Sequence, residues 1–283
     1  MALISTSAAP PQRTWAHYSE PSFVEVDGLR TAYRRKGVGE QVVYLHGGGL
    51  TRLWLPFLEE MAGHHDVIAP EHPGFGDTET PDTLDDMYDF VLHYDGLFNA
   101  LGVDEAHLVG HSLGGWVAAE LAVFYPRRFR SLTLITPAGL RVADRIAVPG
   151  VDSFRLEPAE AGETLMNGRG DRYTEFFEQE GFPNDAVQAF TESTTRAKLS
   201  WNPRYDRKLD HRLARVTTPT LVLGAEDDRL VTNAVAQRYA DLIPGARHVV
   251  VAGPDGEASS HLVQLEQPAD VAALIAAHVA ANA

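Results

Sequence analysis

The sequence predicts an α/β fold in which a mostly parallel, eight-stranded sheet carries helices on both faces. Eight short segments rich in Val, Leu and Ile recur along the chain, and segments with helical spacing separate most of them. A strand that returns to its sheet through a helix runs parallel to the strand before it, and helices then cover both faces. With 283 residues, the chain is long enough to bury a substantial core.

The first two predicted strands, residues 22–26 and 31–35, form a hairpin. They flank Asp27 and Gly28, and an Asp-Gly pair between apolar runs is a strong signal for a two-residue turn. The other predicted strands are residues 41–45, 67–70, 106–109, 131–136, 220–225 and 247–252. Helical spacing is clearest over residues 84–101, 116–124 and 235–242.

The region 137–203 breaks this alternation. It is polar, charged and punctuated by Gly and Pro, yet its aromatic residues offer apolar anchors. We therefore expect a helical cap inserted into one core domain, which comprises residues 21–136 and 204–283, after a loose N-terminal arm at residues 1–20. A disordered linker is the alternative for this region.

Composition excludes several classes of function. The chain has 39 acidic and 24 basic residues and a formal charge of −15, which repels nucleic acids and anionic lipid surfaces. It has no Cys, so disulfides, thiolate metal sites and cysteine nucleophiles are excluded, and the redox compartment stays open. The first residues lack the pattern of a signal peptide, and no apolar run reaches the roughly 18 residues of a membrane span. We expect a cytoplasmic protein with a small-molecule substrate, without nucleic-acid or membrane partners, and of undefined oligomeric state.

Residues 110–114 read Gly-His-Ser-Leu-Gly between a predicted strand and a predicted helix. A sharp strand-to-helix turn projects the central side chain of this motif out of the sheet, and the glycines relieve crowding in the turn. Ser112 is therefore the candidate nucleophile. An oxyanion forming beside it would lie at the positive N-terminus of the helix.

Three glycines follow His46 directly after the third predicted strand. Backbone N–H groups of such a loop approach a reacting carbonyl oxygen closely because glycine has no side chain. We expect an oxyanion hole made by the N–H of Leu113 and that of Gly48 or Gly49. The alternative is a flexible Gly-rich turn that binds no ligand.

Together, His-Gly-Gly-Gly, Gly-His-Ser-Leu-Gly-Gly, the Pro-Gly-Phe-Gly sequence at residues 73–76 and a late histidine resemble the α/β-hydrolase fold family. The resemblance covers residues 24–279 and is weakest across the insertion. It implies that the nucleophile, the acid and the histidine follow one another in this order along the chain.

His261 is the candidate general base. It follows the last predicted strand and precedes Glu266-Gln267-Pro268 by five residues, a spacing similar to the family pattern G-H-x-x-x-x-E-x-P. Ser260 stands where that pattern has Gly. His46 and His111 belong to the glycine motifs, and we interpret both as buried hydrogen-bonding residues.

Three carboxylates at Glu226, Asp227 and Asp228 compete for the role of the triad acid. The family segment has Asp followed by a basic residue and an aliphatic pair, which selects Asp228 because Arg229, Leu230 and Val231 follow it. Alignment on Gly224 instead selects Asp227. We favour Asp228 and interpret the other two as solvated turn residues.

These residues predict a serine hydrolase that cleaves a small ester or related acyl substrate through an acyl-enzyme, without a cofactor or a metal. The resemblance also allows hydrolysis of a carbon–carbon bond next to a ketone, and a catalytically silent binding protein is the alternative from another class. No HExxH or early GxGxxG motif supports a metal hydrolase or a dinucleotide enzyme. Pocket residues are expected at Trp54, Leu140, Phe177 and Trp201, although packing within the core and cap explains the aromatic residues equally well.

Overall fold

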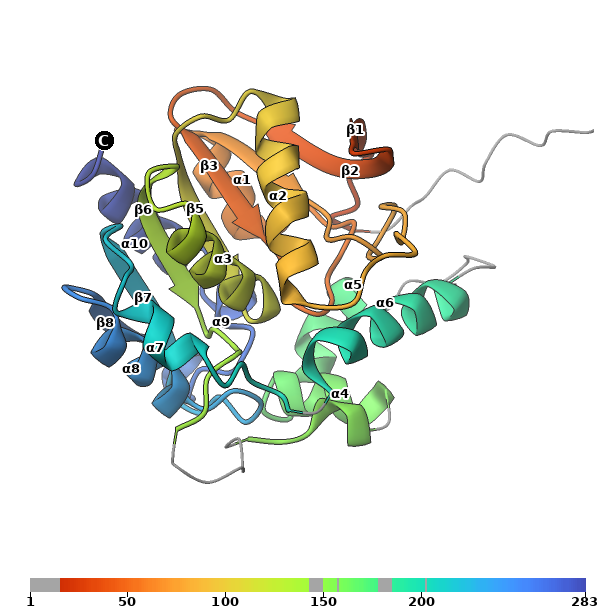
Figure 1. The fold of residues 1–283 in the computed structure, drawn as a ribbon. Helices are drawn as coiled ribbons and strands as arrows, with labels where there is room; N and C mark the ends of the chain where they lie inside the picture. Colours follow the sequence, from red (N-terminus) through yellow and green to blue (C-terminus); the bar gives the residue numbers. More distant parts are fainter. Residues whose placement is uncertain (1–15, 143–149, 157, 178–184, 202) are drawn as a thin grey trace, which may run out of the picture.

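The computed structural model describes residues 16–142, 150–156, 158–177, 185–201 and 203–283 (Figure 1). Its sheet has the strand order β1-β2-β4-β3-β5-β6-β7-β8. Strands β3 to β8 run parallel, and β2 is antiparallel to β1 and β4, which confirms the predicted α/β fold with a mostly parallel sheet. The strands are β1 (Ser22–Val26), β2 (Leu29–Lys36), β3 (Gln41–Leu45), β4 (Asp66–Pro70), β5 (Ala106–His111), β6 (Phe129–Ile135), β7 (Thr220–Ala225) and β8 (Arg247–Val251). Residues 1–15 of the predicted N-terminal arm lie outside the described residues.

The hairpin between β1 and β2 forms at the predicted turn. Val26 pairs with Leu29, which leaves a two-residue loop. Asp27 has φ 50° and Gly28 has φ 83°, and two positive φ angles define the type I′ turn that suits twisted antiparallel strands.

Helices cover both faces of the sheet. On one face lie α1 (Pro56–Ala62) and α10 (Pro268–Ala280), and on the other lie α2 (Met87–Leu101), α3 (Leu113–Phe124) and α8 (Asn233–Leu242). Strand β3 shows why both faces need cover, because Val43 and Leu45 pack with the α2 and α3 side while Val42 and Tyr44 pack with the α1 and α10 side. Two short helices, α7 (Leu209–Leu213) and α9 (Val263–Glu266), complete the core.

The ends of α2 follow from local side-chain chemistry. Asp86 accepts hydrogen bonds from the N–H groups of Tyr88 and Asp89, and the Asp89 side chain bonds back, which forms a capping box. Gly102 ends the helix with φ 67°. The helix therefore begins three residues later than the predicted start at residue 84.

The region between β6 and α7 contains several short helical segments, and we call the described part of residues 137–203 the cap. It contains η1 (Ser153–Arg155), α4 (Pro158–Leu165), η2 (Gly170–Tyr173), α5 (Thr174–Phe177) and α6 (Asp185–Ser200). Figure 1 shows α4, α5 and α6 together on the side toward which the arrows of β3 and β6 point. Met166 and Phe176 of the cap are buried in a core cluster with Leu262. No helix of the described residues is long and apolar enough to cross a membrane.

Candidate active site

One residue, Ser112, lies between strand β5 and helix α3. The strand continues to His111 and the helix begins at Leu113, so the turn is tighter than the predicted strand 106–109 and helix 116–124 imply. Ser112 has φ 52° and ψ −113°, a backbone conformation that is strained for a residue with a side chain. The turn places its hydroxyl at the carboxyl end of β5.

The glycines around Ser112 are required by close backbone packing. A Cβ atom at Gly110 would lie 2.3 Å from the carbonyl oxygen of Gly114, and a Cβ atom at Gly114 would lie 2.2 Å from the carbonyl oxygen of Leu45. A side chain at either position would therefore push the helix away from the sheet. This is the physical basis of the glycines in the sequence motif.

A buried chain of hydrogen bonds joins Asp228, His261 and Ser112. His261 Nδ1 lies 2.7 Å from Asp228 Oδ2, and His261 Nε2 lies 2.9 Å from Ser112 Oγ. The carboxylate keeps the imidazole proton on Nδ1, which leaves Nε2 free to accept the proton of the serine hydroxyl. The structure thus brings together the three side chains that the sequence singled out.

The loop after β7 places the carboxylate of Asp228, and not that of Asp227, beside His261. Asp228 Oδ1 accepts hydrogen bonds from the N–H groups of Leu230 at 2.9 Å and Val231 at 2.8 Å, which turns Oδ2 toward His261. Asp227 is exposed, and its carboxylate pairs with Arg229. The backbone of the aliphatic pair, Leu230 and Val231, thus orients the Asp228 carboxylate toward His261.

Glu226 lies in an exposed turn, as expected, but its carboxylate also binds the backbone of a second loop. Its Oε2 accepts hydrogen bonds from the N–H groups of Gly253 at 2.9 Å and Ser259 at 3.1 Å. The Ser259 hydroxyl donates in turn to the carbonyl oxygen of Val251 at 2.6 Å. Glu226 therefore ties the acid loop to the long loop that leads to His261, a role without a sequence signal because it depends on contacts between distant segments.

The backbone carbonyl of His261 is held by two core residues. The Thr136 hydroxyl donates to it at 3.1 Å, and His111 Nε2 lies 3.3 Å from it. Thr136 has φ 40°, a strained value for a β-branched residue. Burial, with the His261 ring close by, lowers the pKa of His111 well below its usual value, so His111 stays neutral beside His261.

The predicted oxyanion residues Gly48, Gly49 and Leu113 all line the same cavity as Ser112. Leu113 is the first residue of α3, where the backbone N–H has no partner within the helix. Within the described residues, the N–H groups of Gly48 and Gly49 likewise make no hydrogen bond to a protein acceptor. A Cβ atom at Gly48 would lie 2.9 Å from Arg196 Cδ, whereas Gly49 faces open space.

Two buried histidines hold the glycine loop in place. His46 Nδ1 donates to the Gly47 carbonyl at 2.7 Å, and His46 Nε2 accepts the N–H of His72 at 3.0 Å. His72 Nε2 donates to the His46 carbonyl at 2.8 Å, and its Nδ1 accepts the Tyr94 hydroxyl at 2.5 Å. Burial lowers the pKa of His46 to about 4, so its ring is neutral. Each nitrogen of the two rings has a hydrogen-bond partner.

A cavity of about 860 Å³ opens between the core and the cap above Ser112. Leu140 and Phe177 line it as expected, but Trp54 and Trp201 do not. Trp54 is buried and its indole N–H donates to Glu59, whereas Trp201 is 63% exposed and packs on the outside of Phe154. The two tryptophans were wrongly placed because an aromatic residue in a loop or cap suits packing as well as a pocket.

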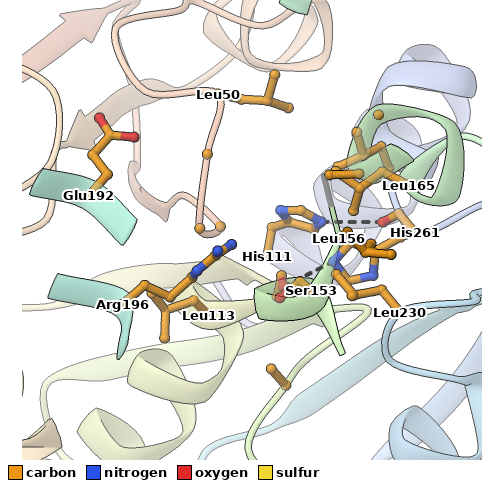
Figure 2. Close-up of a pocket in the computed structure, with 18 of the residues that line it drawn as sticks. Leu50, His111, Leu113, Ser153, Leu156, Leu165, Glu192, Arg196, Leu230 and His261 are labelled. Carbon is orange, nitrogen blue, oxygen red and sulfur yellow. Dashed lines mark hydrogen bonds between the residues drawn. The ribbon is translucent and has the colours of Figure 1, made fainter. Parts of the chain in front are cut away.

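Charged side chains of α6 also face the cavity, and the sequence analysis missed them. Figure 2 shows Glu192 and Arg196 extending from this helix, with Arg196 on the side of Leu113. The Arg196 guanidinium lies 4.6 Å above the Phe154 ring and makes no ion pair within 4.0 Å with any carboxylate that the structure describes. Over the described ranges, no three His, Asp or Glu side chains form a group that could hold a metal ion.

A family model described as the alpha/beta hydrolase fold matches residues 41–266 of the chain. The dihydrolipoyllysine-residue acetyltransferase component of the acetoin cleaving system of Cupriavidus necator is 31% identical, over 91% of this chain and 68% of that protein. A 2-hydroxy-6-oxo-6-phenylhexa-2,4-dienoate hydrolase of Comamonas testosteroni is also 31% identical, over 70% of this chain and 75% of that enzyme.

Solved structures show the same architecture. The structure of a serine hydrolase involved in carbazole degradation superimposes with a TM-score of 0.76 and 22% identity, covering 93% of this chain and 99% of that one. At this level of identity the likeness supports the fold alone.

Proposed function

Because the chain belongs to the α/β-hydrolase fold family, we propose that it is a serine hydrolase that cleaves a small ester or related acyl substrate through an acyl-enzyme. The observation that carries this proposal is the hydrogen-bonded chain from Asp228 through His261 to Ser112, which opens into the cavity. A serine hydroxyl is a weak nucleophile until a base accepts its proton, and this arrangement supplies the base and the carboxylate that orients it.

In the acylation step, Ser112 Oγ attacks the ester carbonyl as its proton moves to His261 Nε2. The negative charge that develops on the carbonyl oxygen is stabilised by the N–H groups of Leu113 and of Gly48 or Gly49. Asp228 stabilises the imidazolium. The bond to the alkoxy group then breaks, and His261 returns the proton to the leaving alcohol.

In the deacylation step, water replaces the alcohol. His261 accepts a proton from the water as its oxygen attacks the acyl carbon, and the same N–H groups stabilise the second oxyanion. The bond to Ser112 Oγ breaks, Ser112 regains its proton, and a carboxylic acid leaves. The cavity is closed on one side by the cap, which keeps bulk water away from the first step.

The test compares wild-type protein with Ser112→Ala on p-nitrophenyl esters of increasing chain length. Wild-type protein should release p-nitrophenol in a burst followed by a steady rate, and the variant should lose both while it keeps its circular dichroism spectrum and melting temperature. A variant with near-native turnover would contradict the proposal. Ligand binding by a wild-type protein without turnover would favour the silent binding protein.

A second candidate is hydrolysis of a carbon–carbon bond next to a ketone in an anionic substrate, and Arg196 favours it. A partly buried cation is costly without a hydrogen-bonded partner, and Arg196 packs on an aromatic ring but has no carboxylate within 4.0 Å among the described residues. The nearest carboxylate of its own helix, Glu192, accepts hydrogen bonds from Thr51 and Gly76 instead. A substrate carboxylate would supply that partner. The relative from Comamonas testosteroni is named for a dienoate, a substrate class with such a carboxylate.

The two candidates are separated by measuring kcat/KM for a neutral p-nitrophenyl ester and for a 2-hydroxy-6-oxo-dienoate. If the carboxylate pairs with Arg196, Arg196→Gln should lower kcat/KM for the dienoate by about 10- to 100-fold, the value of a charge-assisted hydrogen bond. The neutral ester should be affected within about twofold, as expected for a contact that it does not make. Equal effects on both substrates would remove the reason to prefer an anionic substrate.

A further inference from the structure

One buried ion pair joins the cap to the segment that carries His261. Arg169 lies between α4 and η2 of the cap, and its guanidinium pairs with the carboxylate of Glu266 at the end of α9. The two residues are 97 positions apart, and their side chains are 9% and 0% exposed. Glu266 belongs to the Glu-Gln-Pro sequence after His261, and the catalytic steps proposed above leave it without a role.

Both partners also hold the backbone just before His261. Glu266 Oε2 accepts the N–H of Ser260 at 2.7 Å, and Arg169 donates to the carbonyl oxygen of Ala258 at 3.0 Å. A carboxylate that accepts a backbone N–H and a guanidinium together has a defined orientation. The pair therefore fixes the path of the chain at the residue that precedes the imidazole.

The backbone of His261 is thus held from two directions. The core holds its carbonyl through Thr136 and His111 on one side, and the cap holds the preceding residue through Arg169 and Glu266 on the other. Gly170, directly after Arg169, lines the cavity. A displacement of this part of the cap would therefore pull on the backbone next to His261.

We propose that Arg169 and Glu266 are positioning residues for His261, through which the cap sets the placement of the imidazole between Asp228 and Ser112. This inference rests on the proposed function, because it takes His261 as the general base. Among the described residues, no hydrogen bond or ion pair joins either side chain of the pair to Ser112 or to the imidazole, so their effect passes through the backbone of Ser260. Buried ion pairs give little net stability compared with apolar replacements, and orienting a neighbouring group is a role that suits them better.

A neighbouring ion pair provides a matched control. Arg172 of the same cap segment pairs with Glu257 of the same loop at 2.8 Å, but these side chains are 53% and 43% exposed. Glu257 also lies 3.7 Å from Arg169 Nε, so Arg172→Met leaves Arg169 with both of its carboxylate partners. Exposed pairs are weakened by solvent, and Glu257 lies farther from His261 along the chain than Ser260 does. Loss of this pair therefore removes a contact between the same two segments without releasing Ser260.

The experiment compares Arg169→Met, Arg169→Lys and Arg172→Met on p-nitrophenyl acetate. Arg169→Met should lower kcat by about 10- to 100-fold with KM within about twofold, because a small misplacement of a catalytic group costs up to that much. Arg169→Lys should restore part of the rate, and Arg172→Met should match wild type within about twofold. The loss should affect every ester alike, because it acts on the base and not on the fit of the acyl group.

A purely structural role is distinguished by the proton NMR signal of His261 Nδ1–H in its bond to Asp228, measured without substrate beside thermal melting. The far-downfield resonance should shift or broaden in Arg169→Met and stay unchanged in Arg172→Met. An unchanged resonance and a kcat within twofold of wild type would overturn the inference, whatever the melting temperature. If Arg169→Met does not fold, Glu266→Gln decides by the same criteria, since its amide oxygen still accepts from Ser260 but the ion pair is gone.

The outcome is separable from failure of the proposed function. A wild-type protein that neither hydrolyses esters nor reacts with a fluorophosphonate would refute the proposed function. A wild-type protein that does both, with Arg169→Met indistinguishable from it, would refute only the positioning role.

Discussion

Replacement of Asp228 by Asn tests the orientation of the imidazole. In the wild-type protein the N–H groups of Leu230 and Val231 donate to Oδ1 at 2.9 and 2.8 Å. In the variant they hold the amide oxygen at that position, so the amide NH2 group points at His261 Nδ1. Nδ1 must then accept, which moves the ring proton to Nε2 and leaves no acceptor for the Ser112 hydroxyl.

The expected loss follows from that change of tautomer. A triad histidine held in the wrong tautomer lowers kcat by about 10⁴-fold, which equals about 5 kcal/mol of transition-state stabilisation. Asp227→Asn is the matched control and should stay within about twofold of wild type, because its exposed pair with Arg229 contributes little. The assay is steady-state hydrolysis of p-nitrophenyl acetate, with melting curves to show that both variants fold. A loss below tenfold in Asp228→Asn, or equal losses in both variants, would refute the assignment of the acid.

Three further predictions follow from the cavity, the base and the buried histidines. Phe177→Ala should change the order of kcat/KM among p-nitrophenyl esters of different chain length. Trp201→Ala, at a ring that lies outside the cavity, should leave this order unchanged, and the reverse pattern would contradict the described lining. Thr136→Val removes the donor to the His261 carbonyl and should lower kcat by about 3- to 10-fold, whereas Thr136→Ser keeps the hydroxyl and should stay close to wild type. Equal rates in the two variants would argue against this hydrogen bond. The free energy of unfolding, measured by urea titration, should fall as the pH decreases from 6.5 toward 4. The reason is that the pKa of His46 is about 4 in the folded protein and 6.5 when unfolded, so protonation below pH 6.5 favours the unfolded state. A flat profile over this range would contradict the buried neutral ring.

The sequence could predict the placement of a side chain where that placement depends on neighbouring residues. Ser112 is recognisable because the strand, the turn and the helix are consecutive. The flanking glycines are required because a Cβ atom at Gly114 would lie 2.2 Å from the carbonyl oxygen of Leu45. The choice of Asp228 rested on Leu230 and Val231, whose backbone N–H groups bind its carboxylate. The Asp27-Gly28 hairpin is equally local, since its two positive φ angles are all that the turn requires.

Roles that depend on how distant segments pack could not be read from the sequence. The pairing of Arg169 with Glu266 joins residues 97 positions apart, and nothing near either residue indicates it. Arg196 lies on a polar helix, and it faces the cavity because α6 packs next to the glycine loop, which its sequence alone does not indicate. The prediction that Trp54 and Trp201 line the pocket was wrong for the same reason. Trp54 packs against Lys36 and Trp201 packs against Phe154, and neither contact is indicated by the local sequence.

The central claim, that Ser112 is a nucleophile activated by His261, is tested most directly by locating the site of a covalent adduct. Wild-type protein would be treated with a fluorophosphonate, digested, and analysed by peptide mass spectrometry. The account predicts one modification per chain, on Ser112, which is absent from Ser112→Ala and strongly slowed in Asp228→Asn. Modification of a different residue, or equal labelling of wild type and Ser112→Ala, would contradict it.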